Sequence, residues 1–247
     1  MRTTPVTVCA HRGASGTRPE NTLPAFQQAI ALECEMVEFD VRMTSDGHCT
    51  ILHDQTVDRT TNGSGSMWEL SLEQVKALDA GSSFDVSYAG ETIPTLDELL
   101  DALPLSLELN IHVYPGPEDS EAIVREVCRQ IKDRGRFDTA FIAGSEAVMD
   151  LVLVTDAEVR RCLLGSQNDP ESYVRRCRDY DCTDCQPSNR IVSQDFCDAA
   201  HQAGMKVNPF YADDEPEMQR LIEYGVDGIL TNYSERMIDL LKQLNLR

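Results

Sequence analysis

Acidic residues stand where apolar side chains are expected in two stretches of the chain. Glu38 and Asp40 alternate with apolar residues in Val-Glu-Phe-Asp-Val, so on a strand their side chains share one face. Glu108 in Leu-Ser-Leu-Glu-Leu-Asn repeats the arrangement on the next predicted strand. Because unpaired carboxylates are costly inside a protein, the three acids predict a hard cation, Mg²⁺ or Ca²⁺, as their common partner. The alternative is that each acid pairs with a core arginine such as Arg42.

Two histidines could supply acid–base chemistry near these acids. His11 follows the first predicted strand in Cys-Ala-His-Arg-Gly, and His53 ends the run Thr-Ile-Leu-His-Asp. A histidine both takes and gives a proton near neutral pH, so two of them on opposite sides of a bond suit paired proton transfer. Arg12 adds a planar donor fork that fits a phosphate or a carboxylate. The alternative is that each histidine is a hydrogen-bonded core or surface residue.

Short β-branched apolar runs alternate with helical patterns along the whole chain. Strands are predicted at Val6–Ala10, Met36–Val41, Leu105–Ile111, Ala140–Ala143, Arg161–Leu164, Arg190–Val192, Lys206–Phe210 and Gly228–Leu230. Helices are predicted at Leu23–Leu32, Ser120–Arg134, Glu146–Val152, Pro170–Arg178, Gln194–Ala203, Glu215–Tyr224 and Glu235–Leu244. Eight strands, nearly all followed by a helix, indicate an α/β fold, the (β/α)8 TIM barrel, which commonly takes about 250 residues. Residues 1–247 are therefore predicted to form one domain.

One long stretch interrupts this alternation. Residues 54–95 follow the second predicted strand, where only a helix is expected, and they are rich in Gly, Ser and Thr. Ser71–Leu78 predicts a short helix capped by Ser71, while Thr95 and Glu98 predict a capping box on the next helix. In a barrel, an insertion at this point lies over the end where active sites are found.

The charge balance excludes several kinds of partner. The chain has 22 Lys and Arg against 42 Asp and Glu, which gives a formal net charge of −20. A field this negative opposes binding to nucleic acids and stable association with anionic membranes. An anionic substrate would therefore need a local positive charge, and a bound cation would provide one. A homo-oligomer is compatible with the composition.

Cysteine usage and the lack of targeting patterns predict a cytoplasmic protein. No apolar run approaches the roughly 20 residues of a membrane span, and the N-terminal stretch lacks the apolar core of a secretory signal. The nine cysteines are scattered, which is typical of reduced thiols. Cys177, Cys182 and Cys185 resemble half of a zinc site, but a second ligand pair at suitable spacing is absent.

An ordered set of short motifs resembles the glycerophosphodiester phosphodiesterase family. The motifs are His11-Arg12-Gly13, Arg18-Pro19-Glu20-Asn21-Thr22, Glu38-Phe39-Asp40-Val41, Asp46-Gly47, His53-Asp54, Asp58-Arg59-Thr60-Thr61-Asn62-Gly63, Ile93-Pro94-Thr95-Leu96, Leu107-Glu108 and Gly225-Val226-Asp227-Gly228-Ile229-Leu230-Thr231-Asn232. The resemblance covers essentially the whole chain and is strongest at its two ends. It also implies a barrel with an insertion after the second strand, in agreement with the pattern of predicted elements.

The resemblance implies metal-dependent hydrolysis of a glycerophosphodiester to sn-glycerol 3-phosphate and an alcohol. It implies the following roles: His11 and His53 as catalytic acid and base; Glu38, Asp40 and Glu108 as ligands of one divalent cation, Mg²⁺ or Ca²⁺; Arg12, Asn110 and Phe210 beside the phosphate or substrate; and Glu20 and Asn21 as supports of His11 and Arg12.

The chain also departs from the family pattern. The strand that carries Glu108 usually continues to a Lys two residues on, where this chain has Asn110. Asp213 takes the place of a common Asn, and Asn232 replaces a frequent Asp. His112 shares the face of Glu108, where it could compensate for the missing Lys or cap a loop. These differences concern substrate preference and catalytic efficiency more than the class of reaction.

Two other functions are compatible with the same residues. A phosphodiesterase acting on lysophospholipids would need an apolar groove beside the barrel mouth, which Met67, Trp68, Phe84 and Tyr88 could supply. A barrel that binds a phosphate ester without turning it over is the second alternative, and the missing Lys is its only support.

Overall fold

Eight parallel strands form a closed barrel in the computed structural model, which describes residues 5–247. The strands are β1 (Thr7–His11), β2 (Met36–Met43), β4 (Glu108–Val113), β5 (Ala140–Gly144), β6 (Arg160–Leu163), β7 (Asp184–Cys185), β8 (Lys206–Val207) and β9 (Gly228–Thr231). Ladder pairing follows the order β6-β5-β4-β2-β1-β9, and β7 pairs with β8. Backbone hydrogen bonds from Thr183 N to Arg161 O (3.1 Å) and from Asp227 N to Val207 O (2.8 Å) close the ring. The predicted TIM-barrel fold is therefore confirmed.

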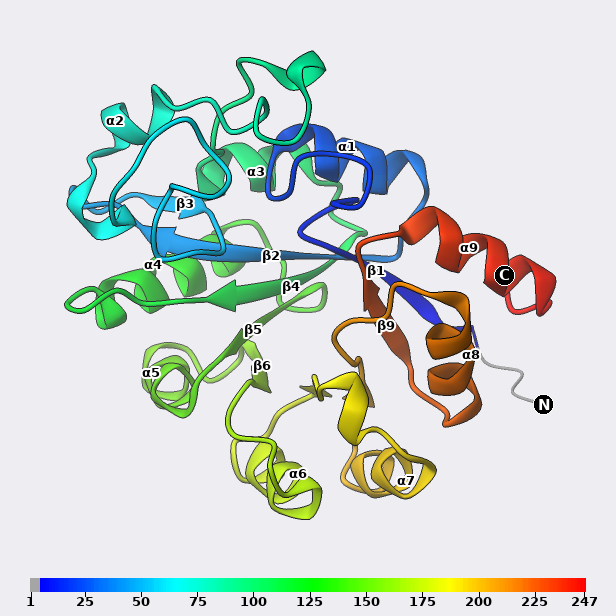
Figure 1. Ribbon diagram of the computed structural model, residues 1–247. Coiled ribbons are helices and arrows are strands. Elements are labelled where there is room, and N and C mark those ends of the chain that lie inside the picture. Colours follow the sequence, from blue (N-terminus) through cyan, green and yellow to red (C-terminus); the bar gives the residue numbers. More distant parts are fainter. Residues whose placement is uncertain (1–4) are drawn as a thin grey trace.

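Helices cover the outside of this ring (Figure 1). They are α1 (Leu23–Ala31), α3 (Leu96–Ala102), α4 (Ser120–Asp133), α5 (Glu146–Thr155), α6 (Pro170–Asp179), α7 (Gln194–Gln202), α8 (Glu215–Glu223) and α9 (Ser234–Gln243). Each presents one apolar face to the strands. In α4, for example, Ile123, Val127 and Ile131 recur every four residues, and all three are buried. Within residues 5–247, no helix is long and apolar enough to cross a membrane.

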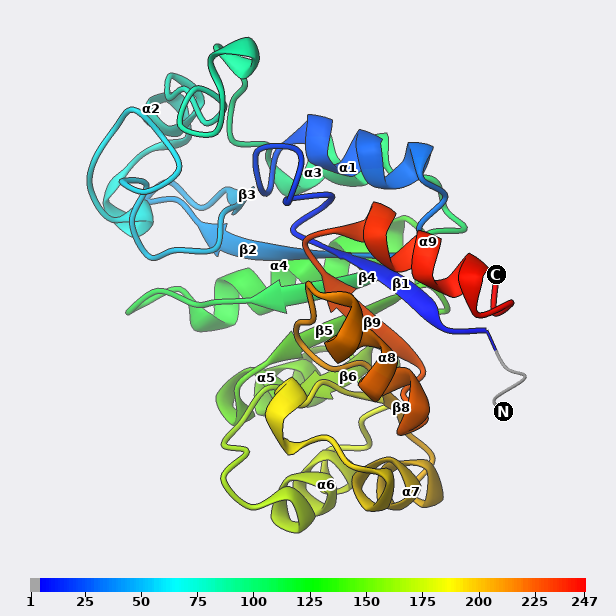
Figure 2. The same ribbon diagram turned by 45° about the vertical axis from the view of Figure 1, so that its right-hand side comes forward.

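The insertion leaves the barrel after β2 and returns at α3. It comprises β3 (Cys49–Ile51), which pairs antiparallel with β2, followed by the short helices η1 (Met67–Glu69), α2 (Leu72–Lys76) and η2 (Val86–Tyr88). Figures 1 and 2 show it standing away from the ring on one side. It packs around its own small buried cluster of Leu52, Val57, Met67, Val75, Ala80 and Ile93. Both predicted helix caps are present: Ser71 and Thr95 each form a capping box.

One predicted strand is wrong. Residues 190–192 do not form a strand, because Asn189–Ile191 is the 3₁₀ helix η3 and the sixth barrel strand is β7. That strand is only two residues long and begins with the buried Asp184, so it lacks the apolar run that marks the other strands. The assignment of the whole chain to one domain stays a prediction.

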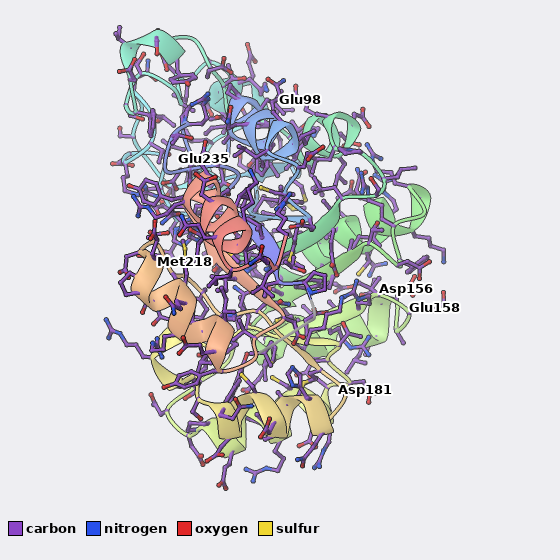
Figure 3. The ribbon with its side chains drawn as sticks, turned by 90° about the vertical axis from the view of Figure 1, so that its right-hand side faces the viewer. Glu98, Asp156, Glu158, Asp181, Met218 and Glu235 are labelled. Carbon is purple, nitrogen blue, oxygen red and sulfur yellow. The ribbon has the colours of Figure 1, made fainter. Side chains whose placement is uncertain are left out.

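The two ends of the barrel face different surroundings. Figure 3 shows Asp156 and Glu158, which precede β6, and Asp181, which precedes β7, on the side away from the insertion. Because the barrel strands are parallel, they all begin at that end and all finish at the other. Side chains at the finishing ends of the strands therefore meet at one mouth, the usual place of active sites in this fold.

Candidate active site

Strands β2 and β4 bring two acids and a histidine together at the carboxyl-terminal end of the barrel. In their parallel register, Glu38 lies beside Asn110 and Asp40 lies beside His112. The His112 Nδ1 atom is 3.2 Å from Glu38 Oε1 and 3.8 Å from Asp40 Oδ1. All four side chains are buried. Burial lowers the pKa of His112 to about 4, so its ring is neutral at neutral pH.

Buried oxygen atoms in this region lack partners. Glu38 Oε1, Asp40 Oδ1, Asn21 Oδ1 and Asn110 Oδ1 accept no hydrogen bond. Burial, followed by repulsion from Asp40, raises the pKa of the Glu38 carboxyl well above its usual value. Buried polar atoms are normally satisfied, and a set of oxygens left without donors fits a divalent cation. Among the described residues, Glu38, Asp40 and His112 are the group of His, Cys, Asp and Glu side chains placed to hold a metal ion.

Glu108 does not join this group, which corrects the predicted ligand set. It is the first residue of β4 and pairs with Met36, the first residue of β2, so it lies at the opposite end of the barrel from Asp40. There its carboxylate accepts a hydrogen bond from Arg160 Nη2 at 2.8 Å. The same nitrogen donates to Asp184 at 2.8 Å. Glu108 is therefore neutralised by an arginine, which is the alternative that the sequence left open for each acid.

The register also changes the comparison of β4 with the family pattern. Asn110, not Glu108, faces Glu38. The Lys of the family pattern stands two residues after the acid of this strand. Counted from Asn110, that position is occupied by His112. Asn110 does not line the cavity at the mouth of the barrel, which is described below. Its amide nitrogen donates to Gln186 Oε1 at 2.7 Å. The predicted contact of Asn110 with the phosphate therefore has no support in the structure.

His11 ends β1, and its ring is fixed by a chain of two polar side chains. Its Nδ1 atom lies 2.7 Å from Asn232 Oδ1. Asp213 orients that amide, because Asp213 Oδ2 accepts from Asn232 Nδ2 at 2.7 Å. The amide oxygen must then face His11, so neutral His11 carries its proton on Nδ1 and leaves Nε2 unprotonated. Burial, followed by the charge of Arg12, lowers the pKa of His11.

Arg12 lies between the acids and the surface of the mouth. Its backbone is left-handed (φ 56°), which turns its N–H toward Glu38 Oε2 at 2.9 Å. Its guanidinium donates to Glu20 at 2.8 Å and lies 3.5 Å from Asp40. Asn21, also left-handed (φ 58°), donates from Nδ2 to Asp40 Oδ2 at 2.8 Å. Glu20 and Asn21 thus hold Arg12 and Asp40 in place.

His53 follows β3 and is fixed from the insertion side. Its Nδ1 atom is 2.7 Å from Asp54 Oδ1, and a hydrogen bond from Arg59, together with that histidine contact, lowers the pKa of Asp54. Arg59 also donates twice to Glu20, each at 2.8 Å. The His53 carbonyl accepts hydrogen bonds from Arg42 at 2.9 and 2.6 Å. Arg42 is thus engaged by this carbonyl, which argues against the alternative that it neutralises the buried acids.

A cavity of about 460 Å³ joins the two histidines. His11, Arg12, Asp40, His53 and His112 all line it. The remaining wall is largely aromatic and aliphatic, and it includes Tyr114, Leu164, Phe210 and Tyr211. Phe210 thus lines the cavity, and its contact with the substrate stays a prediction. None of Met67, Trp68, Phe84 and Tyr88 lines this cavity, but Phe84 of the insertion lines a second cavity that His11, Arg12 and Tyr211 also line.

Sequence reasoning left His112 unresolved and missed Gln186, Tyr114 and Tyr211. The signal for His112 was its place on the same strand face as Asn110, and the structure confirms that placement. Gln186 follows the two-residue strand β7 and had no periodic signal. Cys177, Cys182 and Cys185 are buried and form no disulfides, and they do not belong to the group of side chains that, among the described residues, is placed to hold a metal ion.

The fold and the cavity define a class of protein, the α/β barrels in which histidines, buried acids and an arginine surround one mouth. Comparison with known proteins identifies the family. The glycerophosphoryl diester phosphodiesterase family matches residues 11–236. The chain therefore belongs to this family of phosphoric diester hydrolases.

Individual relatives agree over nearly the whole chain. A glycerophosphodiester phosphodiesterase of Caldanaerobacter subterraneus is 31% identical over 246 residues, which cover 96% of this chain and 98% of the relative. The crystal structure of an Oleispira antarctica phosphodiesterase in complex with the product sn-glycerol-3-phosphate superposes with a TM-score of 0.90 at 27% identity, covering 96% of this chain and 97% of that one. A solved structure from Thermotoga maritima has a TM-score of 0.76 at 22% identity, covering 95% of this chain and 98% of that one, and it supports the fold.

Proposed function

We propose that this phosphodiesterase converts glycerophosphodiesters to sn-glycerol 3-phosphate and an alcohol, with His11 and His53 transferring protons and a divalent cation held by Glu38 and Asp40. One observation carries the proposal. Two buried carboxylates with unpartnered oxygens lie in the same region as two histidines whose Nδ1 atoms are already engaged, and all but Glu38 line one cavity. The product of the Oleispira antarctica relative supports this choice of substrate.

Each histidine keeps one ring nitrogen for the substrate. Asn232 engages Nδ1 of His11, and Asp54 engages Nδ1 of His53. In both rings Nε2 is left to exchange a proton. One ring takes the proton of the attacking hydroxyl or water while the other protonates the departing alcohol oxygen, and the two exchange protonation states in the process. Asn232 and Asp54 hold the rings in the tautomers that this exchange requires.

Arg12 and the cation compensate the negative charge of the substrate. The phosphodiester is an anion, and the chain carries a net charge of −20, so binding requires local positive charge. Arg12 lines the cavity, where it is oriented by Glu20 and can donate to the phosphoryl oxygens. When bound, a divalent cation neutralises phosphoryl charge and lowers the pKa of an attacking hydroxyl. Phe210 and the other aromatic side chains of the wall surround the rest of the substrate.

The test is release of glycerol 3-phosphate from glycerophosphocholine and glycerophosphoethanolamine. Chelated protein is assayed alone and with added Mg²⁺, Ca²⁺ or Mn²⁺, beside H11A and H53A. The variant H201A is the matched control, because His201 lies outside the cavity on α7 and contacts Asp227. We expect cation-dependent release that both site variants lose and the control keeps. Lysophosphatidylcholine is assayed in parallel, and turnover of that substrate alone would contradict the proposed substrate.

A further inference from the structure

We infer that the cation site of this chain has a nitrogen ligand, His112, so that it selects first-row transition ions such as Mn²⁺ over Ca²⁺. The inference rests on the proposed function, since it concerns the same cation. It differs from the sequence prediction, in which three carboxylates surround the metal. In the structure the third position is an imidazole, because Glu108 lies at the other end of the barrel.

Distances within the cluster fit coordination by one ion. The ligand atoms of Glu38, Asp40 and His112 all lie within 4.8 Å of one another. His112 Nδ1 is 3.2 Å from Glu38 Oε1 and 3.8 Å from Asp40 Oδ1. Around an ion with bonds of about 2.1 Å, adjacent ligands lie about 3.0 Å apart and opposite ligands about 4.2 Å apart. Both measured distances fall between these two values, and both carboxylate oxygens are unpartnered.

Gln186 engages the other nitrogen of the same ring. His112 Nε2 is 3.3 Å from Gln186 Oε1 and 3.0 Å from Gln186 Nε2. Asn110 Nδ2 donates to Gln186 Oε1 at 2.7 Å, which holds the carboxamide beside the ring. Gln186 Nε2, the nearer atom, can donate to His112 Nε2 in the metal-free protein, whereas Gln186 Oε1 accepts the Nε2–H of His112 when a cation takes the Nδ1 lone pair. A hydrogen bond from the ring nitrogen that does not bind the metal is typical of metal-binding histidines.

Tyr114 is compatible with a lone pair on the same nitrogen. Its hydroxyl lies 3.4 Å from His112 Nδ1. A phenol hydroxyl can donate to an unprotonated ring nitrogen. A weak contact at this distance is displaced more readily than a charge-assisted one.

The ligand charges favour an anionic substrate. Two carboxylates and a neutral imidazole carry a charge of −2, so a divalent cation neutralises the cluster. Three carboxylates would leave a charge of −1 facing the phosphodiester. With a neutral cluster, the positive charge of Arg12, 3.5 Å from Asp40, remains available for the phosphate.

The donor set determines the preference among cations. Ca²⁺ prefers six to eight oxygen ligands, whereas imidazole suits transition ions. We therefore expect Mn²⁺ to bind at least about tenfold more tightly than Ca²⁺.

The experiment is Mn²⁺ titration of chelator-treated protein by electron paramagnetic resonance, with pulsed measurements of ¹⁴N coupling. We expect one bound Mn²⁺ with a directly coordinated nitrogen, which changes to a ¹⁵N signal when histidine is labelled. H112Q should lose the coupling and weaken Mn²⁺ binding by at least about tenfold. H48Q, which changes an exposed histidine, should do neither. Circular dichroism checks that H112Q is folded.

The outcomes separate this inference from the proposed function. One outcome is that Mn²⁺ binds the unsubstituted protein without nitrogen coupling and that E38Q loses this binding. That result overturns the His112 ligand and leaves the cation proposal intact. A coupling that survives H112Q and disappears in H11Q, or Ca²⁺ that displaces Mn²⁺ at equal concentration, also overturns it. If no Mn²⁺ binds in a manner that depends on Glu38, that result contradicts the cation of the proposed function itself. The labelling and Ca²⁺ competition need no variant, so an unfolded H112Q would not prevent the test.

Discussion

The two ends of the barrel both carry acids on their strands, but the ends differ in whether the carboxyl oxygens have donors within the chain. At the amino-terminal end, Arg160 donates to Glu108 and Asp184, each at 2.8 Å, and Asn208 donates to Asp184 at 3.1 Å. At the carboxyl-terminal end, Glu38 and Asp40 keep one unpartnered oxygen each. The first end pairs its acids within the chain, whereas the second end leaves acceptors open to a ligand.

This difference shows how to separate structural from functional carboxylates. Breaking a buried ion pair leaves an uncompensated charge and costs stability, so Arg160 and its acids hold the fold. A buried acid that keeps one oxygen without a donor, as Glu38 and Asp40 do, costs stability as it stands, and it persists where function requires it. The four predictions below test the contrast, beginning with the largest effect.

Removing a proton-transfer group at the carboxyl-terminal end should abolish activity and spare the fold. We expect H53A to lower kcat by about 10³-fold, since general acid–base groups contribute about 10² to 10⁴. Its midpoint of urea unfolding should stay close to that of the parent protein, because the side chain of His53 is about one-third exposed. Steady-state assays with unfolding curves check both expectations. Full activity in H53A would remove His53 from the mechanism.

Removing the positive charge of Arg160 at the amino-terminal end should lower stability and spare activity. R160M leaves Glu108 and Asp184 without their shared donor, and we expect a loss of about 3 kcal/mol in the free energy of unfolding. Activity per folded molecule should stay near the parent value. K206M is the matched control, because Lys206 is exposed and 3.8 Å from Glu108, and it should cost about 1 kcal/mol or less. Equal losses in the two variants would contradict the contrast.

The pH dependence of stability should reveal the burial of the Glu38 carboxyl in metal-free protein. Its pKa is raised by burial above the ordinary value of 4.5, so the folded protein holds a proton that the unfolded chain releases. That contribution is present below about pH 4.5 and is lost as the pH rises toward neutral. Relative to E38Q, the chelated parent should therefore lose stability between about pH 4.5 and 7. A constant difference between the two proteins across this range would show that Glu38 ionises as freely as an exposed acid.

The smallest effect is expected at Arg59, an ion-pair residue at the rim of the mouth. It joins Asp54 of the insertion to Glu20 of the loop after β1, and its side chain is 48% exposed. R59A should cost about 1 kcal/mol or less in stability, as exposed ion pairs do. Because Asp54 loses the partner that orients it against His53, kcat should fall by about tenfold. Loss of stability comparable with that of R160M would place Arg59 with the structural charges instead.

Much of the fold followed from the sequence because local patterns agree with it. Apolar spacing located α4 and α8 within one residue at either end, and capping chemistry located the starts of α2 and α3. Strand β7 escaped because it has only two residues and a buried acid. A strand that carries a satisfied charge does not show the apolar pattern on which such predictions depend.

The site was only partly predictable, and Glu108 shows why. Alternation of side chains shows that Glu108, Asn110 and His112 share a face, but not which of them lies beside Glu38. That depends on the pairing of β4 with β2, which is a property of two segments 70 residues apart and not of either alone. His11 and His53 were found because each ends or follows a strand, and Glu38 and Asp40 because they alternate with apolar residues inside one.

The central claim is that the carboxyl-terminal end requires a cation to act as a phosphodiesterase site. The most direct test is the rate of glycerol 3-phosphate release from glycerophosphocholine by chelated protein, before and after stoichiometric Mn²⁺. We predict no release before addition and full activity afterwards, with E38Q inactive under both conditions. An undiminished rate in the chelated protein, with no change on adding the ion, would contradict the claim.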